Sequence, residues 1–106
     1  MPEEKLVLST TGSREEAQRI AHTLVQERLA ACVNVIGPMQ SVYRWQNNVD
    51  SAEEFLLLIK TTAAAYARVQ ARLRALHSYQ LPEIIELNIA GGSAEYLKWV
   101  ADCVKP

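Results

Sequence analysis

Residues 32–61 read CVNVIGPMQSVYRWQNNVDSAEEFLLLIKT, and this stretch decides the fold. Its first half, Cys32 to Trp45, is rich in β-branched and aromatic residues and is interrupted at Gly37-Pro38, which predicts one long, bent strand. Gln46-Asn47-Asn48 predicts a turn, because Asn tolerates the left-handed conformation that tight hairpins require. Glu54 to Thr61 predicts the returning strand. The stretch as a whole therefore predicts a long β-hairpin.

On both sides of this hairpin, strand and helix patterns alternate. We predict a strand over Lys5 to Thr10, a helix from Arg14 to about Leu29, a helix from Ala63 to Leu76, a strand over Glu83 to Ala90 and a helix after Ser93 to about Val104. Ser13 and Glu16 have the spacing of a capping box at the start of the first helix. The order β-α-β-β-α-β plus a C-terminal helix predicts an α+β, ferredoxin-like (split βαβ) fold with both main helices on one face of an antiparallel sheet.

Composition and charge restrict the class of protein. The 106 residues are 49% hydrophobic and 22% charged, which is typical of one globular domain spanning residues 1–106. The net charge of −1 provides no reason to expect nucleic acid or an anionic membrane as a partner, and the apolar runs are shorter than the roughly 20 residues of a membrane span. Cys32 and Cys103 lie far apart without metal-site spacing, which indicates reduced thiols and a cytoplasmic location.

The strands are apolar on both faces. Leu6, Val7 and Leu8 do not alternate with polar residues, and neither does the run from Phe55 to Ile59. If both main helices lie on one face of the sheet, the other face would be a large apolar patch in water. We expect another copy of the same chain to cover it.

Metal-ligating and basic residues are few. His22 falls on the polar face of the first helix, where we expect it to be solvated, and His77 falls at the end of the second helix, either as a cap residue or as a ligand. The acid-free segment from Phe55 to Pro82 is either a solvated basic face or an anion groove. RNA binding is disfavoured, because the FLLLIK run at residues 55–60 has aliphatic residues where RNA-binding members of this fold expose aromatic ones.

Four blocks of residues together resemble the CutA-type divalent-cation tolerance family over nearly the whole chain. They are Leu29-Ala30-Ala31-Cys32-Val33-Asn34, then Ser41-x-Tyr43-x-Trp45, then Glu54 leading to Ile59-Lys60-Thr61, and finally His77-x-Tyr79 with Pro82-Glu83-Ile84-Ile85. The resemblance implies a small cytoplasmic, ferredoxin-like protein that forms homotrimers through the central hairpin. It also implies a link to copper tolerance, divalent-metal binding in some members, and an architecture similar to PII-type signalling trimers.

Two departures from the family pattern affect these expectations. The family's Trp-x-Gly at the hairpin turn is Trp45-Gln46-Asn47 here, which the fold tolerates because Asn readily adopts left-handed conformations. The copper ligands proposed for the family, a Cys in the first strand and a His-His pair, fall on Ser9, Leu76 and His77. Only His77 is retained, so the resemblance implies weak copper binding at most and no required cofactor.

These observations favour a non-enzymatic homotrimer that binds a metal ion or small ligand in a cleft between subunits, with a signalling-like role. We expect that cleft where the end of the hairpin meets the segment after the second helix, built by Trp45, Lys60, His77, Tyr79 and Glu83. Alternatively, the aromatic residues are interface packing and Lys60 with Glu83 is a structural ion pair. An enzyme of unknown reaction in the same cleft is the other alternative, with Glu54, Glu83 and His77 as acid–base candidates.

Overall fold

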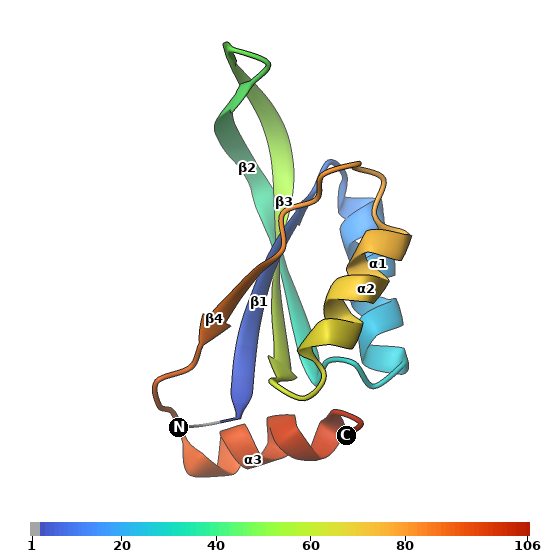
Figure 1. Ribbon diagram of the computed structural model, residues 1–106, viewed down its shortest axis with the longest axis vertical. Coiled ribbons are helices and arrows are strands. Elements are labelled where there is room, and N and C mark those ends of the chain that lie inside the picture. The colour runs from blue at the N-terminus through green and yellow to red at the C-terminus, as the bar shows by residue number, and fades with distance from the viewer. Residues whose placement is uncertain (1–2) are drawn as a thin grey trace.

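The central sheet joins four strands in the order β2-β3-β1-β4, and every neighbouring pair is antiparallel. The computed structural model describes residues 3–106. Its elements are β1 (Glu4–Thr11), α1 (Arg14–Gln26), β2 (Cys32–Trp45), β3 (Asn48–Thr62), α2 (Tyr66–Leu76), β4 (Ile85–Asn88) and α3 (Ala94–Cys103), as Figure 1 shows. This order and pairing confirm the predicted α+β, ferredoxin-like arrangement with one additional C-terminal helix.

The hairpin of β2 and β3 projects well beyond the helices (Figure 1). Trp45 pairs with Asn48 across a two-residue turn in which Gln46 and Asn47 have φ values of 49° and 69°. Positive φ at both positions is the geometry that matches the twist of paired strands. β3 begins at Asn48 and not at the predicted Glu54, because backbone pairing with β2 continues to the tip despite the polar sequence there.

The bend in β2 lies where the sequence predicts it. The register shifts between Ile36 and Met39, around a cis Gly37-Pro38 bond. Gly37 has a φ of 157°, and a Cβ at this position would lie 2.6 Å from Cδ2 of Phe55. The bulge therefore brings the β2 backbone against the Phe55 ring, and only glycine allows that approach.

The hydrophobic core lies between the sheet and the helices α1 and α2, which cover the same face (Figure 1). Its largest fully buried side chains are Ile20, Leu24, Leu57, Ile59 and Leu73.

Several elements are shorter than predicted. α1 ends at Gln26, because Arg28 adopts a left-handed conformation and the amides of Leu29 and Ala30 both turn back to the carbonyl of Leu24. α2 begins at Tyr66 after a turn, and β4 spans only the four residues that pair with β1.

The other face of the sheet is apolar and open to solvent, as predicted. We call it the open sheet face. The strand register places on it Leu6, Leu8, Ile36, Leu56, Leu58, Ile85 and Leu87. All seven are half-buried or exposed, with Ile36 at 49% and Ile85 at 45% exposed. Among residues 3–106, no helix is long and apolar enough to cross a membrane.

Candidate functional site: a groove between the hairpin and the segment after α2

A groove of about 730 Å³ lies where the hairpin leaves the sheet and the chain between α2 and β4 passes beside it. We call it the Tyr79 groove. It is lined by Thr10, Ser41, Val42, Tyr43, Trp45, Glu54, Tyr79, Gln80, Leu81 and Glu83. Aromatic rings and two carboxylates are thus gathered from β2, from β3 and from the segment after α2.

Tyr79 connects the two sides of this groove. Its hydroxyl donates a hydrogen bond of 2.9 Å to Oε2 of Glu54 on β3. Burial, followed by this bond and the charge of Glu54, raises the pKa of Tyr79 to about 12. The phenol therefore stays protonated and acts as a hydrogen-bond donor. Gly12 makes room for it, because a Cβ at Gly12 would lie 3.0 Å from the Tyr79 hydroxyl oxygen.

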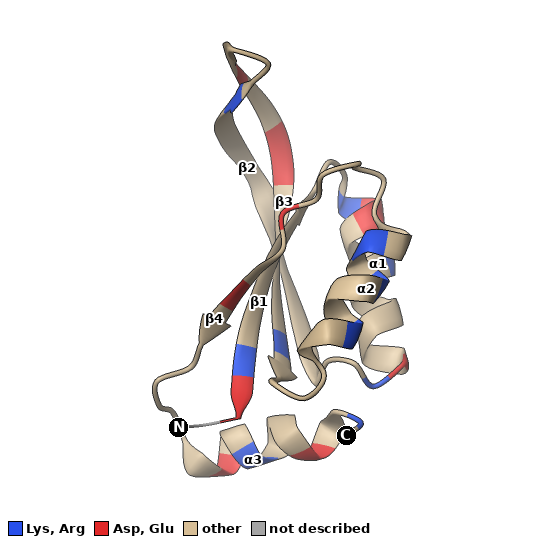
Figure 2. Cartoon of the chain, in the orientation of Figure 1, with Lys and Arg blue, Asp and Glu red and all other residues tan. Residues whose placement is uncertain are grey.

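The second carboxylate is Glu83. Burial, and to a smaller extent the charge of Glu54, raises the pKa of Glu83 above its ordinary value. Among residues 3–106, neither Glu54 nor Glu83 forms an ion pair with a basic side chain. Figure 2 shows the acidic positions on β3 and on the segment before β4. The groove is consequently negative, without a compensating cation from the described chain.

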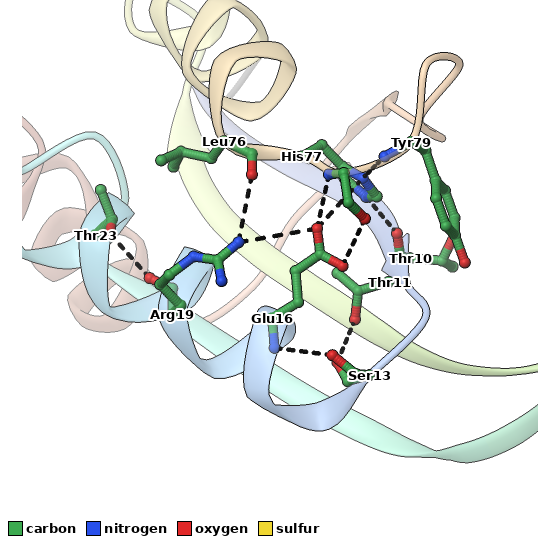
Figure 3. Close-up of polar contacts among 10 residues, drawn as sticks. Thr10, Thr11, Ser13, Glu16, Arg19, Thr23, Leu76, His77 and Tyr79 are labelled. Carbon is green, nitrogen blue, oxygen red and sulfur yellow. Dashed lines mark hydrogen bonds and ion pairs between the residues drawn. The ribbon is translucent and has the colours of Figure 1, made fainter.

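His77 lies behind Tyr79 and is buried. Its Nε2 lies 2.6 Å from the carbonyl oxygen of Thr10, and its Nδ1 accepts the backbone N–H of Tyr79 at 3.0 Å (Figure 3). A carbonyl can only accept, so Nε2 carries the hydrogen and Nδ1 is the acceptor. The two rings lie 4.8 Å apart. His77 therefore holds the backbone of Tyr79 in place, and it is also the C-cap of α2, as predicted.

Glu16 supports the same segment from α1. Its two carboxylate oxygens accept from the backbone N–H of Ser78 at 2.8 Å and from the Ser78 hydroxyl at 3.0 Å. Oε2 also lies 3.7 Å from Nδ1 of His77. The predicted capping box is only half formed. The hydroxyl of Ser13 accepts from the backbone N–H of Glu16, but the Glu16 carboxylate turns to Ser78, which has two donors to offer it.

The structure brings together most, but not all, of the predicted cleft residues. Trp45, Tyr79 and Glu83 line the Tyr79 groove, and His77 stands directly behind it. Lys60 does not join them within one chain. It pairs with Cys32 across β2 and β3, and its Nζ contacts Asn34 and lies 3.8 Å from Sγ of Cys32. The alternative of a Lys60–Glu83 ion pair is not formed within residues 3–106 of one chain. Glu54 lines the groove together with Glu83, and Lys60 lies six residues, roughly 20 Å, along β3 from Glu54.

The positions that the family resemblance assigns to copper ligands are Ser9, Leu76 and His77 in this chain. Ser9 is fully buried and its hydroxyl has no hydrogen-bond partner within residues 3–106, Leu76 is half-buried, and both ring nitrogens of His77 are engaged. The described residues contain no group of three or more His, Cys, Asp or Glu side chains placed to hold a metal ion. Metal binding at His77 stays a prediction.

Some residues of the groove were not predicted from the sequence. Ser41 and Tyr43 line it together with Trp45, and all three have the same parity on β2, which was a usable signal because alternate strand residues share a side. Gln80 and Leu81 lie between the predicted residues Tyr79 and Glu83, so the predicted segment already contained them, whereas Thr10 comes to the groove only through tertiary packing. Away from the groove, His22 is exposed as predicted. The basic face of α2 is partly balanced by the end of another helix, because Arg72 forms a two-bond ion pair with Glu27, the C-cap residue of α1.

Comparison with known proteins identifies the family. The family model of the CutA1 divalent ion tolerance protein matches residues 5–103. The chain belongs to the CutA1 family. A divalent-cation tolerance protein CutA from Thermus thermophilus is 50% identical over 93% of this chain and 96% of its own length. A chloroplastic CutA protein from Arabidopsis thaliana is 40% identical over 94% of this chain, which spans only 55% of that longer relative.

Solved structures of CutA1 proteins have the same fold. The Thermus thermophilus structure gives a TM-score of 0.94 at 48% identity, covering 96% of this chain and 99% of that one. CutA from Xylella fastidiosa gives a TM-score of 0.94 at 41% identity, covering 97% and 99%. The resemblance found in the sequence and the ferredoxin-like CutA1 fold are thereby confirmed. The family model and the Thermus thermophilus relative are named for tolerance of divalent ions, and neither name refers to a catalysed reaction.

Proposed function

We propose that this CutA1 chain forms a homotrimer that binds a small ligand or a metal ion in clefts to which the Tyr79 groove contributes, with a signalling-like role in divalent-cation tolerance. The observation that carries the proposal is the continuity of the groove with the open sheet face. Along β3, the alternate residues Glu54, Leu56 and Leu58 share one side of the sheet. Thr10 and Leu8 of β1 pair with Leu56 and Leu58, so they lie on that same side. A copy seated on the apolar face would border the groove.

The open sheet face supports assembly on physical grounds. Seven large aliphatic side chains on one face exceed what a monomer commonly leaves in water, and burying them in a symmetric oligomer is favourable. Size-exclusion chromatography with light scattering tests this directly. We expect about 36 kDa, three times the 11.9 kDa of one chain. A mass of about 12 kDa would exclude the trimer.

Ligand binding is tested by thermal shift against a library of metabolites and metal salts. A ligand that binds only the folded state raises the unfolding temperature, and a groove ligand should lose this effect in a Tyr79→Ala variant. Tyr66→Ala is the matched control, because Tyr66 lies on α2 outside the groove. A library without any Tyr79-dependent hit would argue against a ligand-binding role.

One observation favours the alternative of an enzyme using the same cleft. Glu83 has a raised pKa and shares the groove with a second carboxylate, and such pairs occur among general acids and bases. Conversion of a library hit into product, abolished by Glu83→Gln, would place the protein in the enzyme class. We favour the non-enzymatic role because the names of the relatives refer to no catalysed reaction.

Copper binding and location complete the proposal. We propose at most weak copper binding, since one His per subunit provides too few ligands unless neighbouring copies supply more. We also propose a cytoplasmic location, without nucleic-acid or membrane partners. The two free cysteines, Cys32 and Cys103, support a reducing compartment.

A further inference from the structure

We propose that the Tyr79 groove is selective for a small organic ammonium ion, held by the carboxylates of Glu54 and Glu83 beside the aromatic rings of Tyr43, Trp45 and Tyr79. The inference rests on the proposed function, because it assigns the ligand class of the same groove. It goes beyond that function in predicting the charge and the chemical type of the ligand.

The first step is the charge of the groove. Its ten lining residues include two glutamates and no Lys or Arg. The partner of Glu54 is the Tyr79 hydroxyl, a neutral donor, and Arg14, which is near in the fold, is occupied by the Gly37 carbonyl and the Phe55 ring. Within one chain, a cation is therefore the ligand that would compensate the two carboxylates, of which Glu54 is half-buried.

The second step is the aromatic lining. Within one chain, Tyr43 is 40% exposed and Trp45 50% exposed, and both rings line the groove. The face of an aromatic ring carries negative potential and attracts cations, with Trp the strongest. Rings also provide apolar surface for the carbon substituents of an organic ion. Three rings with two carboxylates match an ammonium group that bears methyl or methylene groups.

The third step excludes other ligand classes. Phosphate and other anions would meet two carboxylates without a basic side chain among the lining residues. Calcium takes six to eight oxygen ligands, and magnesium about six in strict geometry. The described chain assembles no group of three or more acidic, His or Cys ligands in this groove or elsewhere. The groove volume of about 730 Å³ is in the usual range for organic ligands.

The test uses choline and its uncharged isostere 3,3-dimethylbutan-1-ol. Choline has a positively charged quaternary nitrogen where the isostere has a neutral quaternary carbon. Each is titrated into the intact 106-residue protein labelled with ¹⁵N, and the two tryptophan indole signals are followed. Trp45 lines the groove, whereas Trp99 lies on α3 outside it and is an internal control. We expect choline to move the Trp45 signal alone, and saturably, with the isostere about tenfold weaker or more.

Charge-removing variants show whether choline binding depends on the two groove carboxylates in particular or only on the net charge of the protein. Glu54→Gln and Glu83→Gln should each weaken choline binding about tenfold, since each removes one charge-assisted contact. Glu53→Gln is the matched control, because it loses the same charge one residue away, on the opposite side of β3 and outside the groove. Equal binding of choline and its isostere, or unchanged choline binding in both groove variants, would overturn the proposal.

Two further outcomes distinguish this inference from the proposed function. If a neutral or anionic compound from the thermal-shift library moves the Trp45 signal and choline does not, the ammonium selectivity is wrong and the ligand groove stands. Displacement of choline by equimolar Mn²⁺ or Cu²⁺ at the Trp45 signal would assign the two carboxylates to a metal instead. If neither choline nor any library compound moves that signal, both proposals fail together.

Discussion

The hydroxyl of Tyr79 donates to Oε2 of Glu54 across 2.9 Å, and this one bond connects the segment after α2 to the projecting hairpin. The backbone of Tyr79 is held from the opposite direction by Nδ1 of His77, which is itself held by the Thr10 carbonyl. The chain of contacts runs from β1 through the buried imidazole to β3. The side chain at the centre of the groove is therefore positioned before any ligand arrives.

Replacing Tyr79 with Phe removes the bond to Glu54 and leaves the ring in place. We expect the free energy of unfolding to fall by about 1 kcal/mol, the usual net contribution of such a bond. Urea denaturation measures the change. Tyr66→Phe is the control, because no hydrogen bond of the Tyr66 hydroxyl exists within residues 3–106, and it should be close to neutral. Equal losses in both variants would show that the Tyr79–Glu54 bond contributes nothing specific.

Glu83 should make stability depend on pH. Its folded-state pKa is raised above the ordinary value of 4.5, so the folded protein binds its proton more tightly than the unfolded chain. Stability from this residue is present below pH 4.5 and is lost as pH rises through the raised pKa. Denaturation of wild type and Glu83→Gln between pH 4 and 8 should show the variant gaining relative to wild type as pH rises. A constant difference across that range would contradict the assignment.

Gly12 should be required for the position of Tyr79. In Gly12→Ala the added Cβ would meet the Tyr79 hydroxyl oxygen at 3.0 Å, so the ring must shift and its bond to Glu54 weakens. We expect a loss of about 1 kcal/mol in urea denaturation, similar to Tyr79→Phe. In the double variant the two losses should not add, because both act on one bond. Gly91→Ala is the matched control, since nothing lies within 4 Å of its added Cβ. Additive losses would mean that Gly12 acts elsewhere.

Copper titration tests the family's metal site on this chain. Because both ring nitrogens of His77 are engaged, we expect only weak copper binding, measured by calorimetry on wild type, His77→Ala and His22→Ala. The exposed His22 is the control for adventitious surface binding. Tight binding abolished only in His77→Ala would show that the imidazole exchanges its internal bonds for metal. Tight binding unchanged in that variant would show that copper uses other ligands.

Local patterns predicted most of the fold, and tertiary packing decided what they missed. Strand, turn and helix preferences depend on a few neighbouring residues. This is why the β-branched run before Gly37, the Asn-rich turn and the helical stripes predicted their elements. Glu16 shows the limit. Its spacing from Ser13 predicted a capping box, but the donors of Ser78, sixty-two positions along the chain, occupy its carboxylate. The chemical character of Lys60 and the family resemblance place it with Tyr79 in a cleft between subunits, but within one chain the length of β3 separates Lys60 from the groove.

β2 has consequences for the isolated subunit. Within residues 3–106 it is an edge strand of 14 residues that pairs with β3 alone, and its outer backbone groups are available to another extended chain. Val42 of β2 is 67% exposed, and Val49 of β3 near the hairpin tip is 69% exposed, so this end of the hairpin is apolar as well as unpaired along β2. Long exposed edges of this kind template aggregation. Substitutions that prevent assembly should therefore yield insoluble protein rather than a persistent monomer, and rapid association after synthesis would protect the chain.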